Sequence, residues 1–231
     1  MLPAIWQQPC LNDAMEIKQG MQRVALLTFA VPMLLSAGER VSFGVKGGVP
    51  ITDAFDAARG TSAAYFTDTK RYLVGPTFEV HLPARFSIEV DALYKRLGYQ
   101  YEANGPLVYS KTVANSWEFP LLGKFEILPG PVRPFVDAGV TVRNLSGIKQ
   151  IRQTVSGATL NQVEIDNAVE FNKRNDVGFA FGFGVTLKLG TVRLSPELRY
   201  TRWGGENLRD PIAALLRTNR NQGDFMVGLT F

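Results

Sequence analysis

The chain has 231 residues, of which 45% are hydrophobic and 20% are charged, and this composition suits a single domain. Its formal net charge of +4 comes from interspersed Lys, Arg, Asp and Glu, so no concentrated basic face for nucleic acid is predicted. The sequence has no run of about 20 apolar residues, which excludes a helical membrane span. Cys10 is the single cysteine and cannot form an intrachain disulfide.

Residues 21–38 have the layout of a cleavable secretory signal peptide. Arg23 precedes an apolar stretch at 24–35, and small residues, including Ala37 and Gly38, follow it. The stretch is too short to cross a bilayer, and a buried core helix is the alternative interpretation. We expect cleavage near Ala37 or Gly38.

The N-terminal region therefore differs from the rest of the chain. Residues 1–20 are polar and of mixed charge, which does not suit the basic start of a signal peptide. For this reason we expect translation to begin at Met21, or at Met15. We predict that residues 1–38 comprise an N-terminal extension plus the signal peptide, and that residues 39–231 form an outer-membrane β-barrel.

From residue 40 onward, apolar side chains recur at every second residue, and this period predicts β-strands. Eight such segments follow in chain order: 41–49, 71–82, 86–101, 116–127, 132–143, 176–189, 192–203 and 224–231. They approach or exceed the roughly 9–11 residues that a tilted strand needs to cross a bilayer.

The connections between these segments alternate in length. The short ones are 83–85, 128–131 and 190–191, and the long ones are about 50–70, 102–115, 144–175 and 204–223. Pro and Gly in the short connections favour tight turns. Short periplasmic turns and longer extracellular loops are typical of outer-membrane barrels. The sequence thus predicts an all-β fold: an eight-stranded antiparallel up-and-down transmembrane β-barrel, preceded by a cleavable signal peptide.

Within each segment, one set of alternate residues is apolar and the other set is charged or small. Phe179, Phe181 and Phe183, for example, alternate with Ala180 and Gly182. An eight-stranded barrel has too little interior space for rows of Phe, Tyr and Trp. The apolar set is therefore expected to face outward, where it requires lipid, and the charged set to line the lumen.

Aromatic residues gather at the two ends of the predicted strands. Tyr72, Tyr94, Trp117 and Tyr200 lie beside the long loops, whereas Phe86, Phe125 and Phe231 lie beside the short turns. Two such girdles are expected at the two interfaces of a membrane.

The charged set is balanced in sign. Its basic members are Lys46, Lys95, Lys124, Arg133, Arg143, Lys188, Arg193 and Arg199, and its acidic members are Glu79, Glu89, Asp91, Glu118, Glu126, Asp137, Glu197 and Asp224. Unpaired charges in a narrow, poorly hydrated lumen would cost several kcal/mol each. We therefore predict that these residues form an ion-pair network that plugs the lumen.

Residues 40–55 resemble the first strand of the bacterial outer-membrane β-barrel domain family, the small porin-like barrels of the OmpA/OmpX type. Residues 224–231 are similar to the C-terminal signal that the barrel assembly machinery reads, with Asp224, Leu229 and Phe231 at its polar, hydrophobic and final aromatic positions. The Gly usual at position 226 is Met here. The resemblance covers about residues 39–231 and implies residence in the outer membrane of a Gram-negative bacterium, but no substrate.

Three functions remain open. The first is a structural or surface-interaction barrel in contact with outer-membrane lipid and lipopolysaccharide, with an unknown ligand for its extracellular loops. The second is a narrow, low-conductance porin-like channel for small solutes or ions. The third is a lipid-modifying enzyme that would use His81, the single histidine, with Ser or an acid. No Cys or His cluster and no phosphate-binding motif are present, so no cofactor or metal is expected.

Overall fold

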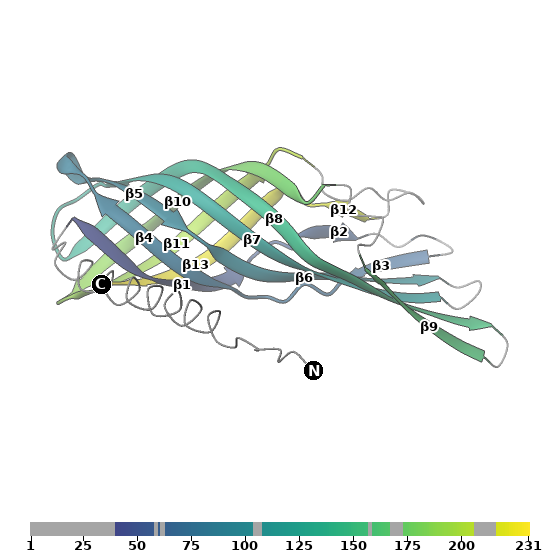
Figure 1. Ribbon diagram of the computed structural model, residues 1–231. Helices are drawn as coiled ribbons and strands as arrows, with labels where there is room; N and C mark the ends of the chain where they lie inside the picture. Colours follow the sequence, from purple (N-terminus) through teal and green to yellow (C-terminus); the bar gives the residue numbers. More distant parts are fainter. Residues whose placement is uncertain are drawn as a thin grey trace, which may run out of the picture. The chain divides into compact units, whose positions relative to one another are not determined.

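The fold was obtained as a computed structural model, shown in Figure 1. The structure describes residues 40–57, 60, 63–103, 108–156, 159–166, 173–205 and 216–231. The predicted signal peptide and the predicted boundary between residues 38 and 39 lie outside these ranges. The chain divides into a unit up to Val41 and a unit Ser42–Phe231, and the description that follows concerns the second unit.

The described unit consists of β-strands joined mostly by turns and loops. The strands are β1 Val41–Pro50, β2 Phe55–Ala57, β3 Ala63–Thr67, β4 Leu73–His81, β5 Phe86–Asp91, β6 Leu93–Ala103, β7 Val108–Glu126, β8 Val132–Ser156, β9 Thr159–Asp166, β10 Asn175–Leu189, β11 Val192–Trp203, β12 Leu216–Thr218 and β13 Asn221–Thr230. A 3₁₀ turn, Pro83–Arg85, joins β4 to β5. Among the described residues, no helix has the length and hydrophobicity to cross a membrane.

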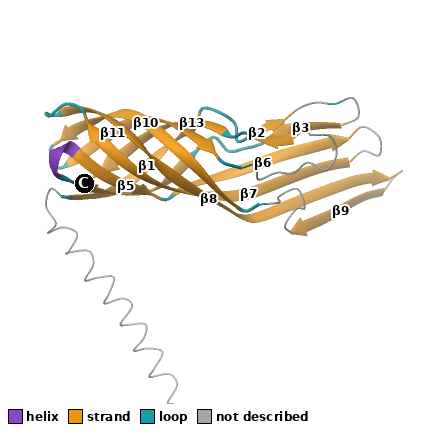
Figure 2. Cartoon of the chain, turned by 90° about the horizontal axis from the view of Figure 1, so that it is seen from above, coloured by secondary structure: helices purple, strands orange, loops and turns teal. Residues whose placement is uncertain are grey.

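The long strands form one antiparallel sheet that closes on itself (Figure 2). Its order runs from β1 through β13, β11, β10, β8 and β7 to the pair β5 and β6, and then through β4 back to β1. Closure is made by β1 and β13, from Gly44 opposite Thr230 to Pro50 opposite Asp224. The antiparallel up-and-down arrangement predicted from the sequence is confirmed.

The predicted strand 86–101 is divided into β5 and β6 at Ala92. The two parts keep one register against β7, so together they occupy one strand position in the barrel. The division arises because Pro76 of β4 lies opposite Ala92. The Ala92 N–H donates to the Pro76 carbonyl at 3.0 Å, but proline has no N–H to donate in return.

Four predicted loops contain additional strand structure, which corrects the sequence-based boundaries. Strand β7 begins at Val108 rather than 116, and β8 continues to Ser156 rather than ending at 143. Strand β9 lies within the predicted loop 144–175, β2 and β3 lie within 50–70, and β12 lies within 204–223. The added parts of β8 and β9 are largely polar, and β2, β3 and β12 have only 3, 5 and 3 residues, so a search for long runs of alternating apolar residues could not find them.

The three short connections lie at one end of the barrel, which we call the turn end, and the long connections lie at the other, the loop end. At the turn end, Gly130 and Gly190 have φ values of 128° and 67°, which suit glycine. At the loop end, β3, β6, β7, β8 and β9 continue beyond the closed ring as one sheet (Figures 1 and 2). We call this the projecting sheet.

Candidate functional site

Two basic side chains from strands far apart in the sequence bind the same three carboxylates in the middle of the lumen. Lys46 of β1 contacts Glu89, lies 2.9 Å from Glu197 and lies 3.4 Å from Asp91. Arg199 of β11 binds the same three carboxylates at 3.0, 2.7 and 2.9 Å. All five residues are at most 4% exposed, so the network is shielded from bulk water.

A third basic side chain extends the network toward the turn end. Lys124 of β7 lies 3.3 Å from Glu79 and 3.5 Å from Glu89, and its ammonium sits 4.2 Å from the centre of the Phe135 ring. Ser87 donates a hydrogen bond to Glu79. Glu89 is thereby shared between several cations, which offsets part of the cost of burying it.

A separate cluster lies nearer the loop end. Glu118 pairs with Lys95 at 2.7 Å and with Arg143 at 3.0 Å. The Arg143 guanidinium lies 3.7 Å from the centre of the Trp203 ring and donates to Gln222. Gln222 and Trp203 were not identified from the sequence, because only charged residues were considered there. The inward position of Trp203 in the alternation of segment 192–203 could have identified it, whereas Gln222 fell within the predicted loop 204–223 and belongs to β13.

The fully buried part of the described interior is not balanced in charge. The buried charged residues are the bases Lys46, Lys95, Lys124, Arg143 and Arg199 and the acids Glu79, Glu89, Asp91, Glu118, Asp137, Asp176, Glu197 and Asp224. Carboxylates therefore outnumber cations by eight to five. Asp176, which the sequence reasoning missed, accepts hydrogen bonds from the backbone N–H groups of Val177 and Gly205.

Several predicted members of the network lie outside its buried part. Lys188 is exposed near the turn end of β10. Arg133 and Glu126 form a half-buried pair at 2.9 Å. Asp137 is buried, but neither of its carboxylate oxygens has a hydrogen-bond partner among the described residues. Asp224 receives a hydrogen bond from Gln222 at 2.6 Å rather than an ion pair.

His81 belongs to a small polar cluster at the turn end. Its Nε2 lies 2.9 Å from the Ser42 hydroxyl oxygen, and its Nδ1 lies 3.6 Å from Glu79. Arg193 donates to Ser42 at 2.8 Å and also contacts the His81 ring. The order Ser–His–Glu is that of a nucleophile, a base and an orienting acid, but Ser42 is only 1% exposed.

An apolar cluster lies at the loop end of the barrel. Its buried members are Ala54, Phe55, Tyr65, Leu97, Tyr99, Leu145 and Leu216, drawn from strands and loops far apart in the sequence. The Phe55 and Tyr99 rings meet edge to face with centroids 5.7 Å apart. The short sheet of β2 and β12 holds Phe55 and Leu216 in this cluster. We call it the apolar cap. Beside it, Asp53, Asp56 and Phe66, among others, line a surface cleft of about 550 Å³.

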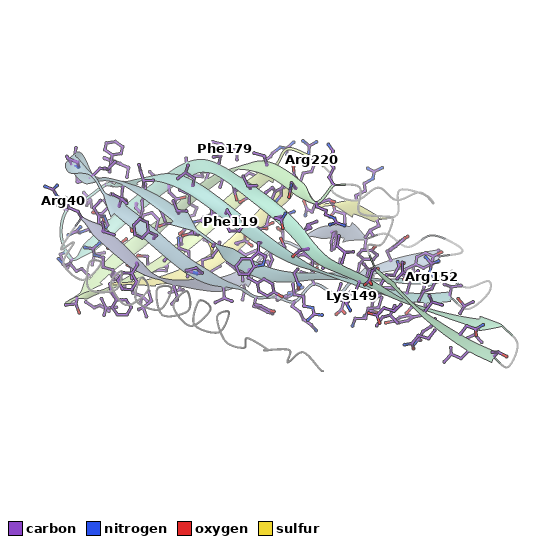
Figure 3. The ribbon with its side chains drawn as sticks, in the orientation of Figure 1. Arg40, Phe119, Lys149, Arg152, Phe179 and Arg220 are labelled. Carbon is purple, nitrogen blue, oxygen red and sulfur yellow. The ribbon has the colours of Figure 1, made fainter. Side chains whose placement is uncertain are left out.

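The outer face of the ring is apolar. Phe119 and Phe179, seen in Figure 3, are 45% and 57% exposed, and Phe181 and Phe183 follow the same pattern. Such a continuous exposed apolar belt is not stable in water and indicates an apolar surrounding. Aromatic contacts border the belt at both ends: Tyr94 lies 5.2 Å from Trp117 at the loop end, and Phe86 lies 4.8 Å from Phe125 at the turn end.

The projecting sheet has a different character from the belt. Every described side chain of β9 except that of Ile165 is exposed, and β9 pairs along one edge with β8. Lys149 and Glu164 form an exposed pair at 2.9 Å across these two strands; Lys149 and Arg152 can be located in Figure 3. This part of the molecule presents polar side chains and strand edges to water.

The described residues contain no group of three or more His, Cys, Asp or Glu side chains placed to hold a metal ion. Glu89 and Glu197 of the lumen bind Lys and Arg side chains.

A family model described as "Outer membrane protein beta-barrel domain" matches residues 22–204, which is more than half of the chain. Among solved structures, the chain is similar to Neisserial surface protein A, with 12% identity, a TM-score of 0.43, and coverage of 82% of this chain and 94% of that one. It is also similar to Ail of Yersinia pestis in complex with the heparin analogue sucrose octasulfate (11% identity, TM-score 0.37, coverage 83% and 99%). A third similar structure is the N-terminal β-barrel domain of OprF from Pseudomonas aeruginosa (11% identity, TM-score 0.30, coverage 82% and 97%).

No curated protein sequence matches the chain significantly. The family match spans β1 to β11, the strands that carry most of the apolar belt and most of the lumen network. The chain therefore belongs to the outer membrane protein beta-barrel domain family and is located in the outer membrane of a Gram-negative bacterium.

Proposed function

We propose that the protein is an eight-stranded transmembrane barrel, exported by a signal peptide within residues 1–38, with a structural or surface-interaction role. Ion pairs plug its lumen, and the long loops face the outside of the cell. The observation that carries this proposal is the buried network around Lys46 and Arg199. The apolar cap adds a second seal at the loop end.

Conductance measurements test the plugged lumen against the porin-like alternative. Protein refolded into a planar bilayer is expected to give no reproducible unitary current steps, because both seals would have to open together. Folding is verified first by cold and boiled SDS-PAGE, in which a folded barrel changes mobility on boiling. Reproducible steps from a sample that passes this control would overturn the plugged lumen and favour the narrow channel.

The projecting sheet supports the surface-interaction role. Strand β8 continues for about 40 Å from Asn144, opposite Trp117 of the girdle, to Ser156, at roughly 3.3 Å per residue. The headgroup region on each side of a bilayer is only about 5–8 Å thick. The tips of β8 and β9 would therefore stand clear of the membrane and could meet a partner in solution.

The orientation can be tested by cysteine labelling on intact cells. With Leu160→Cys in β9, a membrane-impermeant maleimide is expected to label the protein. The matched variant Gly130→Cys, in a turn-end connection, should be labelled only after the outer membrane is permeabilised. Labelling of position 130 alone on intact cells would reverse the proposed orientation.

A lipid-modifying activity is the second candidate, and the pairing of Ser42 with His81 at 2.9 Å favours it. The burial of Ser42 and the contact between Arg193 and His81 oppose it, because a nucleophile needs access and its base needs a free nitrogen. Labelling with a serine-reactive fluorophosphonate discriminates. A signal that Ser42→Ala and His81→Ala both abolish would support the enzyme.

The C-terminal strand carries the proposed signal for the barrel assembly machinery. Leu229 and Phe231 are 37% and 54% exposed on the outer face, whereas Asp224 is buried in the lumen. The assembly machinery could contact all three side chains together only before β1 and β13 pair and close the barrel. Phe231→Ala is expected to slow assembly in cells, measured by the rate at which the heat-modifiable form appears, while Phe183→Ala, on the same face of β10, should not.

A further inference from the structure

At the loop end, the outer face carries three aromatic side chains in a row: Tyr72, which directly precedes β4, Tyr94 of β6 and Trp117 of β7. The ring centroids of Tyr72 and Tyr94 are 6.4 Å apart, and those of Tyr94 and Trp117 are 5.2 Å apart. Tyr94 also donates a hydrogen bond to Asn115 at 2.9 Å. Side chains of this kind settle at the boundary between acyl chains and headgroups. The row therefore marks the level of the membrane interface on this wall.

A basic patch lies one step beyond the aromatic row. Arg96 follows Tyr94 by two residues in β6 and so shares its outward face. The Lys70 N–H donates to the Arg96 carbonyl at 3.0 Å, which places the two backbones side by side. Arg71 follows Lys70 directly, and all three basic residues are exposed. We call Lys70, Arg71 and Arg96 the basic patch.

The basic patch has no ion-pair partner of its own among the described residues, although the charge of Lys70 contributes to the lowered pKa of Asp68. No ion pair or side-chain hydrogen bond involves Lys70, Arg71 or Arg96 among the described residues. The adjacent acid, Asp68, is bound by Lys111 at 2.7 Å. The hydrogen bond from Lys111 lowers the pKa of Asp68, and the same bond raises the pKa of Lys111. Asp68 thus stays ionised and paired with Lys111, and the basic patch keeps an excess of positive charge.

We propose that the basic patch, together with the row Tyr72, Tyr94 and Trp117, binds the phosphate-bearing headgroup of an outer-leaflet glycolipid of the lipid A type. The aromatic row would lie along the acyl chains, and Lys70 and Arg96, whose backbones are joined by a hydrogen bond, would hold one phosphate between them. The inference rests on the proposed orientation, because this lipid occupies the outer leaflet.

The opposite wall of the barrel offers a matched comparison. Arg202 of β11 follows Tyr200 by two residues, as Arg96 follows Tyr94. The Arg202 guanidinium, however, donates to Asn221 at 2.6 Å, and Arg220 donates to the backbone carbonyls of Trp203 and Gly204. These cations are held by the protein itself, so they have fewer free donors for a phosphate. Both walls therefore carry basic residues beside an aromatic side chain, and they differ in whether the donors of those residues are already bound within the protein.

The experiment uses the refolded full chain in a neutral detergent, in which cellular orientation plays no part. Native mass spectrometry measures binding of bis-phosphorylated lipid A, of the same glycolipid without its phosphates, and of inorganic phosphate. The variants are Lys70→Gln/Arg96→Gln and the control Arg202→Gln/Arg220→Gln, which removes the same charge. Cold and boiled SDS-PAGE verifies that each variant is folded. Failure of this binding would leave the cell-labelling test of orientation unaffected.

Each cation near a membrane phosphate contributes about fivefold in affinity, so the patch variant should bind lipid A about 30-fold more weakly. The control variant should stay within about threefold of the unchanged protein. Three results would each overturn the proposal: equal losses in both variants, which indicate unspecific attraction; equal binding of the dephosphorylated glycolipid; and binding of inorganic phosphate as tight as that of the lipid.

Discussion

Replacing Lys46 with Met removes the cation at the centre of the lumen network. The Lys46 ammonium contacts Glu89, Glu197 and Asp91, and the residue is 2% exposed. The substitution keeps most of the volume of the side chain, so packing changes little and loss of charge dominates. Removing one partner of a buried ion pair costs about 3–5 kcal/mol, because the remaining charge stays buried without compensation.

The structure places the expected cost at the lower end of that range. Arg199 still binds the same three carboxylates, and Lys124 still lies 3.5 Å from Glu89. We expect a loss of about 3 kcal/mol in the free energy of unfolding, equivalent to about 150-fold in the folding equilibrium. Reversible urea unfolding in lipid vesicles, followed by tryptophan fluorescence, measures this quantity.

Lys188→Met is the control, because it removes the same charge from an exposed position at the turn end. It should change the free energy of unfolding by less than about 0.5 kcal/mol. If Lys46→Met costs no more than Lys188→Met, the lumen is hydrated enough to screen its charges, and the plug as described does not exist. A double-mutant cycle with Glu197→Gln would then show no coupling, whereas the structure predicts clear coupling at 2.9 Å.

Three further predictions concern the belt, the close pairing of strands and the projecting sheet. Phe181→Arg places a charge on the lipid face near the middle of β10 and should lower the free energy of unfolding by about 2–4 kcal/mol. Val177→Arg, at the loop end of the same face, should lower it by only about 0–1 kcal/mol. Equal losses would argue against a lipid surrounding. Gly139→Ala should lower the urea midpoint by an amount equivalent to about 1–3 kcal/mol, because the Cβ of the new alanine would lie 2.0 Å from the backbone carbonyl oxygen of Leu121 in β7. An unchanged midpoint would refute this close approach of the two strands. Asp68, whose pKa is lowered by the hydrogen bond from Lys111, contributes stability above its ordinary pKa that is lost as pH falls through the lowered value. The pair is partly exposed, so the difference between wild type and Asp68→Asn should be below about 1 kcal/mol at pH 7 and should vanish in acid; a difference that grows in acid would contradict the assignment.

The family and the antiparallel arrangement were predictable because both depend on local pattern. The alternation of Phe179, Phe181 and Phe183 with small residues follows from the geometry of a strand, in which successive side chains point to opposite faces. Such a pattern can be recognised without knowing which strands are neighbours. The tight turns at 128–131 and 190–191 are equally local, since Gly and Pro determine them directly.

The lumen contacts were less predictable because they join strands far apart in the sequence. The alternation of side chains along the strands placed Asp137 and Glu197 in the same set. Glu197, however, lies between Lys46 and Arg199, whereas Asp137 has no hydrogen-bond partner among the described residues. Which carboxylate meets which cation depends on the stagger of the strands around the ring and on the reach of each side chain.

The sequence alone determined the outward apolar face, the inward charged face and the position of the turns, because each depends on residues close together in the chain. Only the tertiary structure decided that β7 and β8 continue beyond the ring, that Pro76 interrupts the ladder opposite Ala92, and which cations bind each buried carboxylate. Each of these features depends on what a neighbouring strand presents across the sheet or the lumen, and that neighbour is set by the closure of the barrel.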